Sequence, residues 1–256
     1  MKAIVFAAGV GSRLKPFTDS HPKALVPVAG IPMLGRVIGK LKNAGVSEIV
    51  VNIHHFPSQI RHYLEENNNF GIDIEISDES DLLLDTGGAL ARIYRESRII
   101  ANAGDNEPVI VHNADILADF ELTGLTETLA GSEAAILVDP HRQSTRRFLF
   151  DSDGKLAGWT NLTNGKVRPE DLDLSGMTMA AFGGIHAMTR STLADISDYC
   201  GQNISPFSIV DFYLDVCREK AVRAFTPSVP YNWFDIGTSE KLAVAEAWAC
   251  ASGLKA

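Results

Sequence analysis

The chain has 256 residues and carries 32 acidic against 23 basic side chains, which gives a net charge of −9 at pH 7. With 45% apolar and 21% charged residues it has the composition of a globular protein with a substantial core, which excludes disordered and fibrous classes. The net acidity argues against a nucleic-acid binder. Cys200, Cys217 and Cys250 lack the spacing of a zinc site or disulfide framework. Gly9 and Gly11 interrupt the apolar opening, so we expect no signal peptide or membrane span and a soluble, cytoplasmic protein.

The first part of the chain predicts alternating strands and helices. Residues 3–8 form a short apolar run that ends in glycines, which is typical of a buried parallel strand. Apolar residues then recur at helical spacing from Leu34 to Leu41, after Pro32, which suits the first helical position, and before Gly45, which suits the end. The other elements expected are strands over 49–53, 72–76 (near an edge) and 109–111, and a helix beginning at Pro57. This order predicts an α/β fold with a Rossmann-like, mostly parallel sheet.

Beyond residue 139 the pattern changes. Residues 147–150 and 155–160 flank the turn 151–154 and predict a hairpin, and the Asn164-Gly165 pair predicts another tight turn. Residues 179–185 form an apolar strand that contains paired glycines, and a helix from Lys241 to about Ala251 closes the chain. We therefore expect an antiparallel extension of the sheet within one continuous domain.

Residues 9–14 follow the first strand and suit a phosphate-binding loop, because glycines expose backbone N–H groups. A dinucleotide fingerprint would need a third glycine where the chain has Leu14 and an acid where it has Asn52, which disfavours a nicotinamide-dependent oxidoreductase. Residues 1–25 carry four cations against one acid, namely Lys2, Arg13, Lys15 and Lys23 against Asp19. Since guanidinium and ammonium groups bind phosphate oxygens, this loop predicts polyphosphate binding.

A resemblance to a known family rests on residues 7–18, AAGVGSRLKPFT, followed by residues 22–28, PKALVPV. This motif is similar to the signature of the sugar-1-phosphate nucleotidyltransferases, also called nucleoside-diphosphate-sugar pyrophosphorylases. The resemblance implies that a nucleoside triphosphate and a sugar 1-phosphate are converted to a nucleotide sugar and pyrophosphate with Mg²⁺. It implies that Arg13 holds the β- and γ-phosphates and that Lys23 neutralises the α-phosphate and the sugar phosphate. The remaining loop residues implied to bind substrate are Ala7, Ala8, Gly9, Gly11 and Ser12.

Two aspartates are candidate metal ligands. Asp115 follows the buried strand 109–111, and a carboxylate at the carboxyl end of such a strand faces the ligand crevice and suits Mg²⁺, with a turn or cap role as the alternative. Its segment resembles the family's V-N-G-D, with Asn113 in place and Ala114 where glycine is usual. Residues 233–238 resemble the family's W-x-D-I-G-T and imply that Asp235 is the second metal ligand, with helix capping as the alternative.

Further candidates concern the choice of base and sugar. Residues 84–89 open a predicted helix and resemble the family loop at the nucleobase, which implies backbone contacts from Gly87 and Gly88. Gly183 and Gly184 resemble the strand beside the sugar. Residues 159–161 stand where many members carry a Glu-Lys-Pro element whose lysine grips the sugar phosphate. The possible replacements are Lys166, Arg142, Arg146 and Arg147.

The short family members that this chain resembles include N-acetylmuramate-1-phosphate uridylyltransferases and mannose-1-phosphate guanylyltransferases. The resemblance implies a nucleotide-binding part over about 1–118, a sugar-phosphate-binding part over 119–238 and a closing helix over 239–254. We expect UTP and N-acetylmuramate 1-phosphate as substrates, GTP and mannose 1-phosphate as the alternative, no nucleic-acid or membrane partner, and a monomer or dimer. A non-catalytic nucleotide-sugar sensor is the alternative of another class, and joint retention of the four charged site residues disfavours it.

Overall fold

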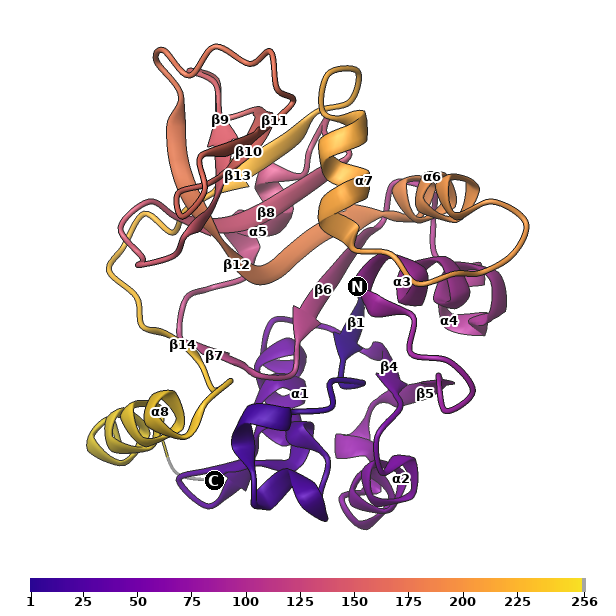
Figure 1. Cartoon of the computed structure of the whole chain (residues 1–256). Coiled ribbons are helices and arrows are strands. Elements are labelled where there is room, and N and C mark those ends of the chain that lie inside the picture. The colour runs from indigo at the N-terminus through magenta and orange to yellow at the C-terminus, as the bar shows by residue number, and fades with distance from the viewer. Residues whose placement is uncertain (255–256) are drawn as a thin grey trace.

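A mixed sheet of ten strands forms the centre of the molecule, which the computed structural model describes over residues 1–254 (Figure 1). Four parallel neighbours stand in the order β6-β1-β4-β5. Their bounds are Lys2–Phe6 for β1, Glu48–Ile53 for β4, Asp73–Asp78 for β5 and Pro108–Asn113 for β6. Ile4 of β1 pairs with Val50 on one side and Val111 on the other, so the three central strands end level with one another. The Rossmann-like sheet and the edge position of β5 are confirmed.

The antiparallel extension begins at β12 (Thr178–Thr189), which pairs with β6 and also with β8 (Ala134–Asp139) and β9 (Arg146–Phe150). The sheet continues through β10 (Leu156–Asn161) to β11 (Lys166–Arg168), while β13 (Val222–Phe225) lies beside β8. Both expected hairpins are therefore present. The strand predicted over 179–185 extends to Thr189, because its second half pairs with β6 and carries the sheet from the parallel part into the extension.

Helices cover both faces of the sheet. On one face lie α1 (Met33–Asn43), α2 (Pro57–Glu66) and α5 (Thr123–Thr128), packed on a core that includes Val5 and Ile110. On the other lie α3 (Asp85–Glu96), α4 (Arg98–Ala101), α6 (Arg190–Cys200) and α7 (Ile209–Val216), packed on Ile4 and Val111. Successive residues of a strand thus pack into opposite cores, which is why the middle residues of β1, β4 and β6 are apolar without alternation.

The structure differs from the expected elements at Pro32. That residue ends the short strand β3 (Ile31–Pro32), which pairs with β2 (Pro27–Val28), and α1 begins one residue later at Met33. Pro32 therefore precedes the helix and is not its first residue, which corrects the expectation. The apolar stripe from Leu34 to Leu41 is buried as predicted.

A separate two-stranded sheet joins the end of the chain to its middle. β7 (Ile116–Ala118) follows β6 directly, and β14 (Trp233–Asp235) pairs with it antiparallel. The helix α8 (Ser239–Ala251) comes next, with the Thr238 side chain accepting a hydrogen bond from Lys241 N at 3.4 Å as its N-cap. In residues 1–254, every helix is too short or too polar to cross a membrane.

Candidate functional site

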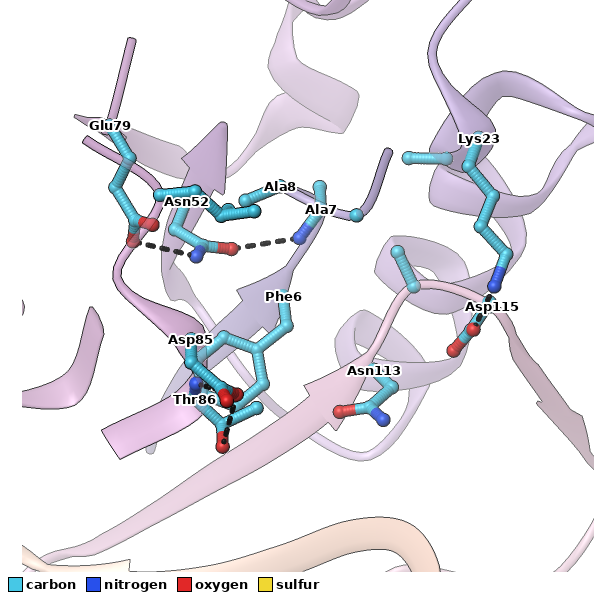
Figure 2. A pocket seen from close by; sticks show the side chains of 14 residues that line it. Phe6, Ala7, Ala8, Lys23, Asn52, Glu79, Asp85, Thr86, Asn113 and Asp115 are labelled. Atoms are coloured by element: carbon cyan, nitrogen blue, oxygen red, sulfur yellow. Dashed lines mark hydrogen bonds and ion pairs between the residues drawn. The ribbon is translucent and has the colours of Figure 1, made fainter. Parts of the chain in front are cut away.

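A cavity of about 360 Å³ opens at the carboxyl ends of β1, β4 and β6 (Figure 2). Open α/β sheets bind ligands at this edge, where the order of strands reverses. Its lining includes three of the predicted loop residues, Ala7, Ala8 and Gly9, together with Lys23, Asn113 and Asp115. The opposite wall comes from Leu83, Asp85 and Thr86, at the start of α3.

A buried polar chain holds the floor of this cavity. Figure 2 shows Asn52 between Ala7 and Glu79. The Asn52 side chain accepts from Ala7 N at 2.8 Å and donates to Glu79 at 2.9 Å, and Glu79 also accepts from Leu84 N at 3.1 Å. Glu79 is fully buried, and burial raises the pKa of its carboxyl group. These hydrogen bonds connect Ala7, directly after β1, to Leu84 in the loop that precedes α3.

Gly11 gives the loop after β1 its shape. Its φ is +70°, in the left-handed region that favours glycine, and its carbonyl accepts from the Thr18 hydroxyl at 2.8 Å. A Cβ at this position would lie 2.8 Å from Thr18 Cγ2 and 2.9 Å from Lys23 Cβ. The short helix Ser12–Leu14 then leaves Ser12 and Arg13 exposed while Leu14 is buried. The absence of a side chain at Gly11 is thus what lets Lys23 lie against the loop.

Of the two predicted metal carboxylates, Asp115 lies in the turn between β6 and β7, and Asp235 lies on β14, the strand that pairs with β7. Asp235 is the last residue of β14 and pairs with Ile116, the residue that follows Asp115, and Ile236 N donates to the Asp115 carbonyl at 3.0 Å. Each carboxylate has a cation: Lys23 bonds to Asp115, and Lys241 lies 2.5 Å from Asp235. Segments far apart in the sequence are therefore brought together at the edge of the first cavity.

The donor set of these two residues fits a magnesium ion. Mg²⁺ takes hard oxygen ligands and is commonly held by one or two carboxylates together with substrate phosphates. Burial acts to raise the pKa of Asp235, but the hydrogen bond and charge of Lys241, the Gly237 N–H and the Lys23 charge outweigh it, so the pKa lies below its usual range. Over residues 1–254, the structure holds no cluster of three His, Cys, Asp or Glu side chains suited to a metal. The remaining ligands of an ion held by Asp115 and Asp235 would be water and substrate oxygens.

A second cavity of about 440 Å³ adjoins the first and shares Asn113 and Asp115 with it. Gly184 forms part of its wall with a φ of +72°, and a Cβ there would lie 2.9 Å from Asn113 Nδ2. Its charged lining residues are Arg13, Asp115, Arg142, Asp235 and Lys241. Two ligands could therefore bind on either side of Asp115, with cations around the point where they meet.

Outside both linings lie Ser12 and four of the predicted glycines, namely Gly11, Gly87, Gly88 and Gly183. Gly87 N and Gly88 N donate to the Phe207 carbonyl at 2.8 Å and 3.4 Å, and a Cβ on Gly87 would lie 2.2 Å from the Phe207 ring. The start of α3 is thus packed beneath residues 205–207, and its cavity residues are Asp85 and Thr86 instead. Gly183 accepts from Trp233 Nε1 at 2.9 Å and packs on Leu137.

The four candidate replacements for the missing lysine separate clearly. Arg142 lines the second cavity, where it hydrogen-bonds to the Phe182 carbonyl and lies over the Trp233 ring with its Cζ 4.0 Å from the centroid. Burial lowers the pKa of the Arg142 guanidinium. Arg147 donates to the carbonyls of Ser144 and Pro140 at 3.0 and 2.9 Å, which is a structural role. The other two candidates, Arg146 and Lys166, line a third cavity farther along the extension.

Sequence reasoning missed several residues of the site, namely Glu79, Asp85, Thr86, Lys241, Trp233 and Phe182. A local signal existed for Lys241, since it stands on the first turn of a helix that follows Asp235 closely. Glu79 had none, because its burial depends on β4 and α3 closing around it.

Comparison with known proteins places this geometry in a family. The model of the nucleotidyl transferase family, NTP_transferase, matches residues 2–147. An N-acetylmuramate alpha-1-phosphate uridylyltransferase of Neisseria meningitidis is 30% identical over 237 residues, which cover 88% of this chain and 97% of that protein. A mannose-1-phosphate guanyltransferase of Gibberella zeae is 38% identical over 141 residues, but these cover 54% of this chain and 37% of that protein. The crystal structure of HddC from Yersinia pseudotuberculosis complexed with GMP-PN has a TM-score of 0.70 at 21% identity and covers 96% of this chain and 98% of that one, which supports the fold.

The chain belongs to the nucleotidyl transferase family. It is therefore an enzyme of the nucleotidyltransferase class, and the fold expected from its first motif is confirmed. The full-length match to the Neisseria protein spans both the parallel sheet and the extension, whereas the match to the Gibberella protein covers only about half of the chain.

Proposed function

We propose that this enzyme transfers a uridylyl group from UTP to N-acetylmuramate 1-phosphate, giving a nucleotide sugar and pyrophosphate. The single observation that carries the proposal is the meeting of two cavities at Asp115, with Lys23, Arg13 and Asp235 around the junction. The choice of substrates is supported by the Neisseria relative, which matches nearly the whole chain. GTP with mannose 1-phosphate remains the second candidate because of the Gibberella relative.

The reaction requires that the two phosphates are aligned and that their negative charge is neutralised. An oxygen of the sugar phosphate attacks the α-phosphorus, a new P–O bond forms, and the bond to the β-phosphate oxygen breaks as pyrophosphate leaves. The attacking group is already ionised at neutral pH, so no general base is required. The first cavity would take the nucleotide and the second the sugar phosphate, so that Asp115 lies between the reacting groups. Positioning two anions in line is itself a large catalytic contribution.

The cations have distinct tasks in this proposal. Lys23 reaches the junction from the base of the glycine loop, where it would lie near the α-phosphate and the sugar phosphate. Arg13 lies beside Asp235, since a Cβ on Gly237 would be 2.7 Å from Asp235 Oδ1 and 3.1 Å from Arg13 Nη2. From this position its guanidinium would bind the β- and γ-phosphates. Asp115 and Asp235 would hold Mg²⁺, which when bound supplies positive charge at the phosphoryl oxygens.

The test is pyrophosphate release measured over a grid of four nucleoside triphosphates and several sugar 1-phosphates, for the wild type and for Asp115→Asn and Asp235→Asn. We expect the wild type to turn over UTP with N-acetylmuramate 1-phosphate fastest. Each substitution should lower the rate by at least about 100-fold, because it removes a carboxylate from the junction. Asp171→Asn is the matched control, since Asp171 is 74% exposed and forms its ion pair with the surface residue Arg218. Turnover of GTP with mannose 1-phosphate alone would contradict the substrate assignment, and full activity of both junction variants would contradict the mechanism.

A further inference from the structure

A third cavity of about 470 Å³ lies beyond Arg142, between helix α7 and one face of the antiparallel extension. It shares Arg142, Ser144 and Phe182 with the second cavity, so the two spaces adjoin at these residues. The transfer reaction described above uses none of its other residues. These other lining residues are Arg146, Phe148, Trp159, Lys166, Arg168, Ser208, Val210, Asp211 and Leu214.

The register of the extension explains why cations and aromatic rings gather on this face. Residues directly opposite on antiparallel strands point to the same side of a sheet, as do residues two apart on one strand. Asn161 of β10 is opposite both Arg146 of β9 and Lys166 of β11. These two cations therefore lie on the same face of the sheet, on either side of β10. Trp159, two residues earlier, is opposite Phe148 and Arg168 and adds an aromatic surface beside them.

Two of the cations on this face are available to a ligand. Arg168 is already neutralised by Asp211 at 2.7 Å and by Asp215 at 3.1 Å. Arg146 and Lys166, by contrast, form hydrogen bonds through their own main-chain atoms, and their charged groups have no partner in the described part of the chain. Both are exposed, so their positive charge faces a cavity whose one carboxylate, Asp211, is held by Arg168.

We propose that Arg146 and Lys166 make this enzyme selective for sugar 1-phosphates that carry a carboxylate substituent. The inference rests on the proposed function, since it takes the sugar phosphate to lie in the second cavity beside Arg142. A substituent that projects from the sugar toward Phe182 would enter the third cavity, where the Trp159 ring offers an apolar surface and the two cations meet the carboxylate. N-acetylmuramate has such a group in its lactyl ether, whereas N-acetylglucosamine has the same acetamido sugar without it.

Charge-assisted hydrogen bonds discriminate because the uncharged analogue leaves the cations with water alone. Because both cations are exposed and screened by water, each such contact changes binding by about 2- to 5-fold. Arg146→Gln and Lys166→Gln should therefore raise KM for N-acetylmuramate 1-phosphate by roughly that factor. They should leave kcat unchanged and should not alter the kinetics with N-acetylglucosamine 1-phosphate, because neither residue touches the junction at Asp115.

The experiment measures KM and kcat for both sugars, and also equilibrium binding of each sugar 1-phosphate in the absence of nucleoside triphosphate. Arg218→Gln is the matched control, since it removes an exposed cation of the same lobe that lies outside the third cavity. A selective loss of affinity for the acidic sugar in both variants supports the proposal, even if the wild type turns over neither sugar and the proposed function fails. An unchanged preference for the acidic sugar, or an equal loss with both sugars, overturns it while leaving nucleotidyl transfer intact.

Discussion

Replacing Gly11 with alanine should reduce both stability and turnover, because the new methyl group would meet two constraints at once. The left-handed φ of +70° costs an alanine about 1–2 kcal/mol. The Cβ would also lie 2.8 Å from Thr18 Cγ2 and 2.9 Å from Lys23 Cβ, and both atoms stand close to the main chain, so they cannot move aside freely. Overpacking of this kind costs about 1–3 kcal/mol. The total loss in the free energy of unfolding should be about 2–5 kcal/mol, measured by urea denaturation.

A second variant, Gly30→Ala, distinguishes the cost of the left-handed φ from the cost of the steric contacts. Gly30 has a φ of +77°, but nothing lies within 4 Å of its added Cβ, so this variant should lose only about 1–2 kcal/mol and keep its activity. In Gly11→Ala the displaced Lys23 should lower kcat by roughly 10- to 100-fold, the scale expected when a reacting group is misplaced. Equal losses of stability in the two variants, together with an unchanged kcat for Gly11→Ala, would refute the reasoning.

Two further predictions concern residues beside the first cavity. Gly87→Ala should lower the free energy of unfolding by about 1–3 kcal/mol, because the new Cβ would clash with the Phe207 ring. In the double variant, Phe207→Ala should relieve part of that loss. Strictly additive losses in urea unfolding would contradict this packing role. Burial raises the pKa of Glu79 above its usual 4.5, so the folded state binds this proton more tightly than the unfolded chain and stability falls as the pH rises from 4.5 through the folded pKa. Glu79→Gln should remove that fall, and an identical pH dependence of unfolding in variant and wild type would disprove the assignment.

The parallel half of the fold could be predicted because its information is local. The strands β1, β4 and β6 are apolar runs that end in glycine or polar residues, and α1 carries its buried stripe at helical spacing. The hairpins of the extension were also predictable, since turn residues mark them in the sequence. Helices α6 and α7 were missed although Phe212, Tyr213 and Leu214 show an apolar pattern.

The residues of the candidate site also differ in how far the sequence alone could place them. The structure brings the two predicted aspartates close together, because β14 pairs with β7 directly after Asp115 and Ile236 N donates to the Asp115 carbonyl. The positions of Gly87 and Gly88 could not be predicted, since they depend on residues 205–207 closing over α3 from a distant part of the chain. Arg146 and Lys166 could be named from the sequence as candidate cations. The strand register was needed to show that they lie on one face and line the third cavity.

The pairing of β14 with β7 has a consequence for how the enzyme is made. The residues that line the first cavity lie between Phe6 and Asp115, whereas Asp235 is synthesised much later. A nascent chain therefore contains every residue of this lining before it contains the second carboxylate of the proposed metal pair. If Asp235 has the role we propose, transfer requires that the segment around Trp233 docks on β7, and a chain cut before Trp233 should lack transferase activity.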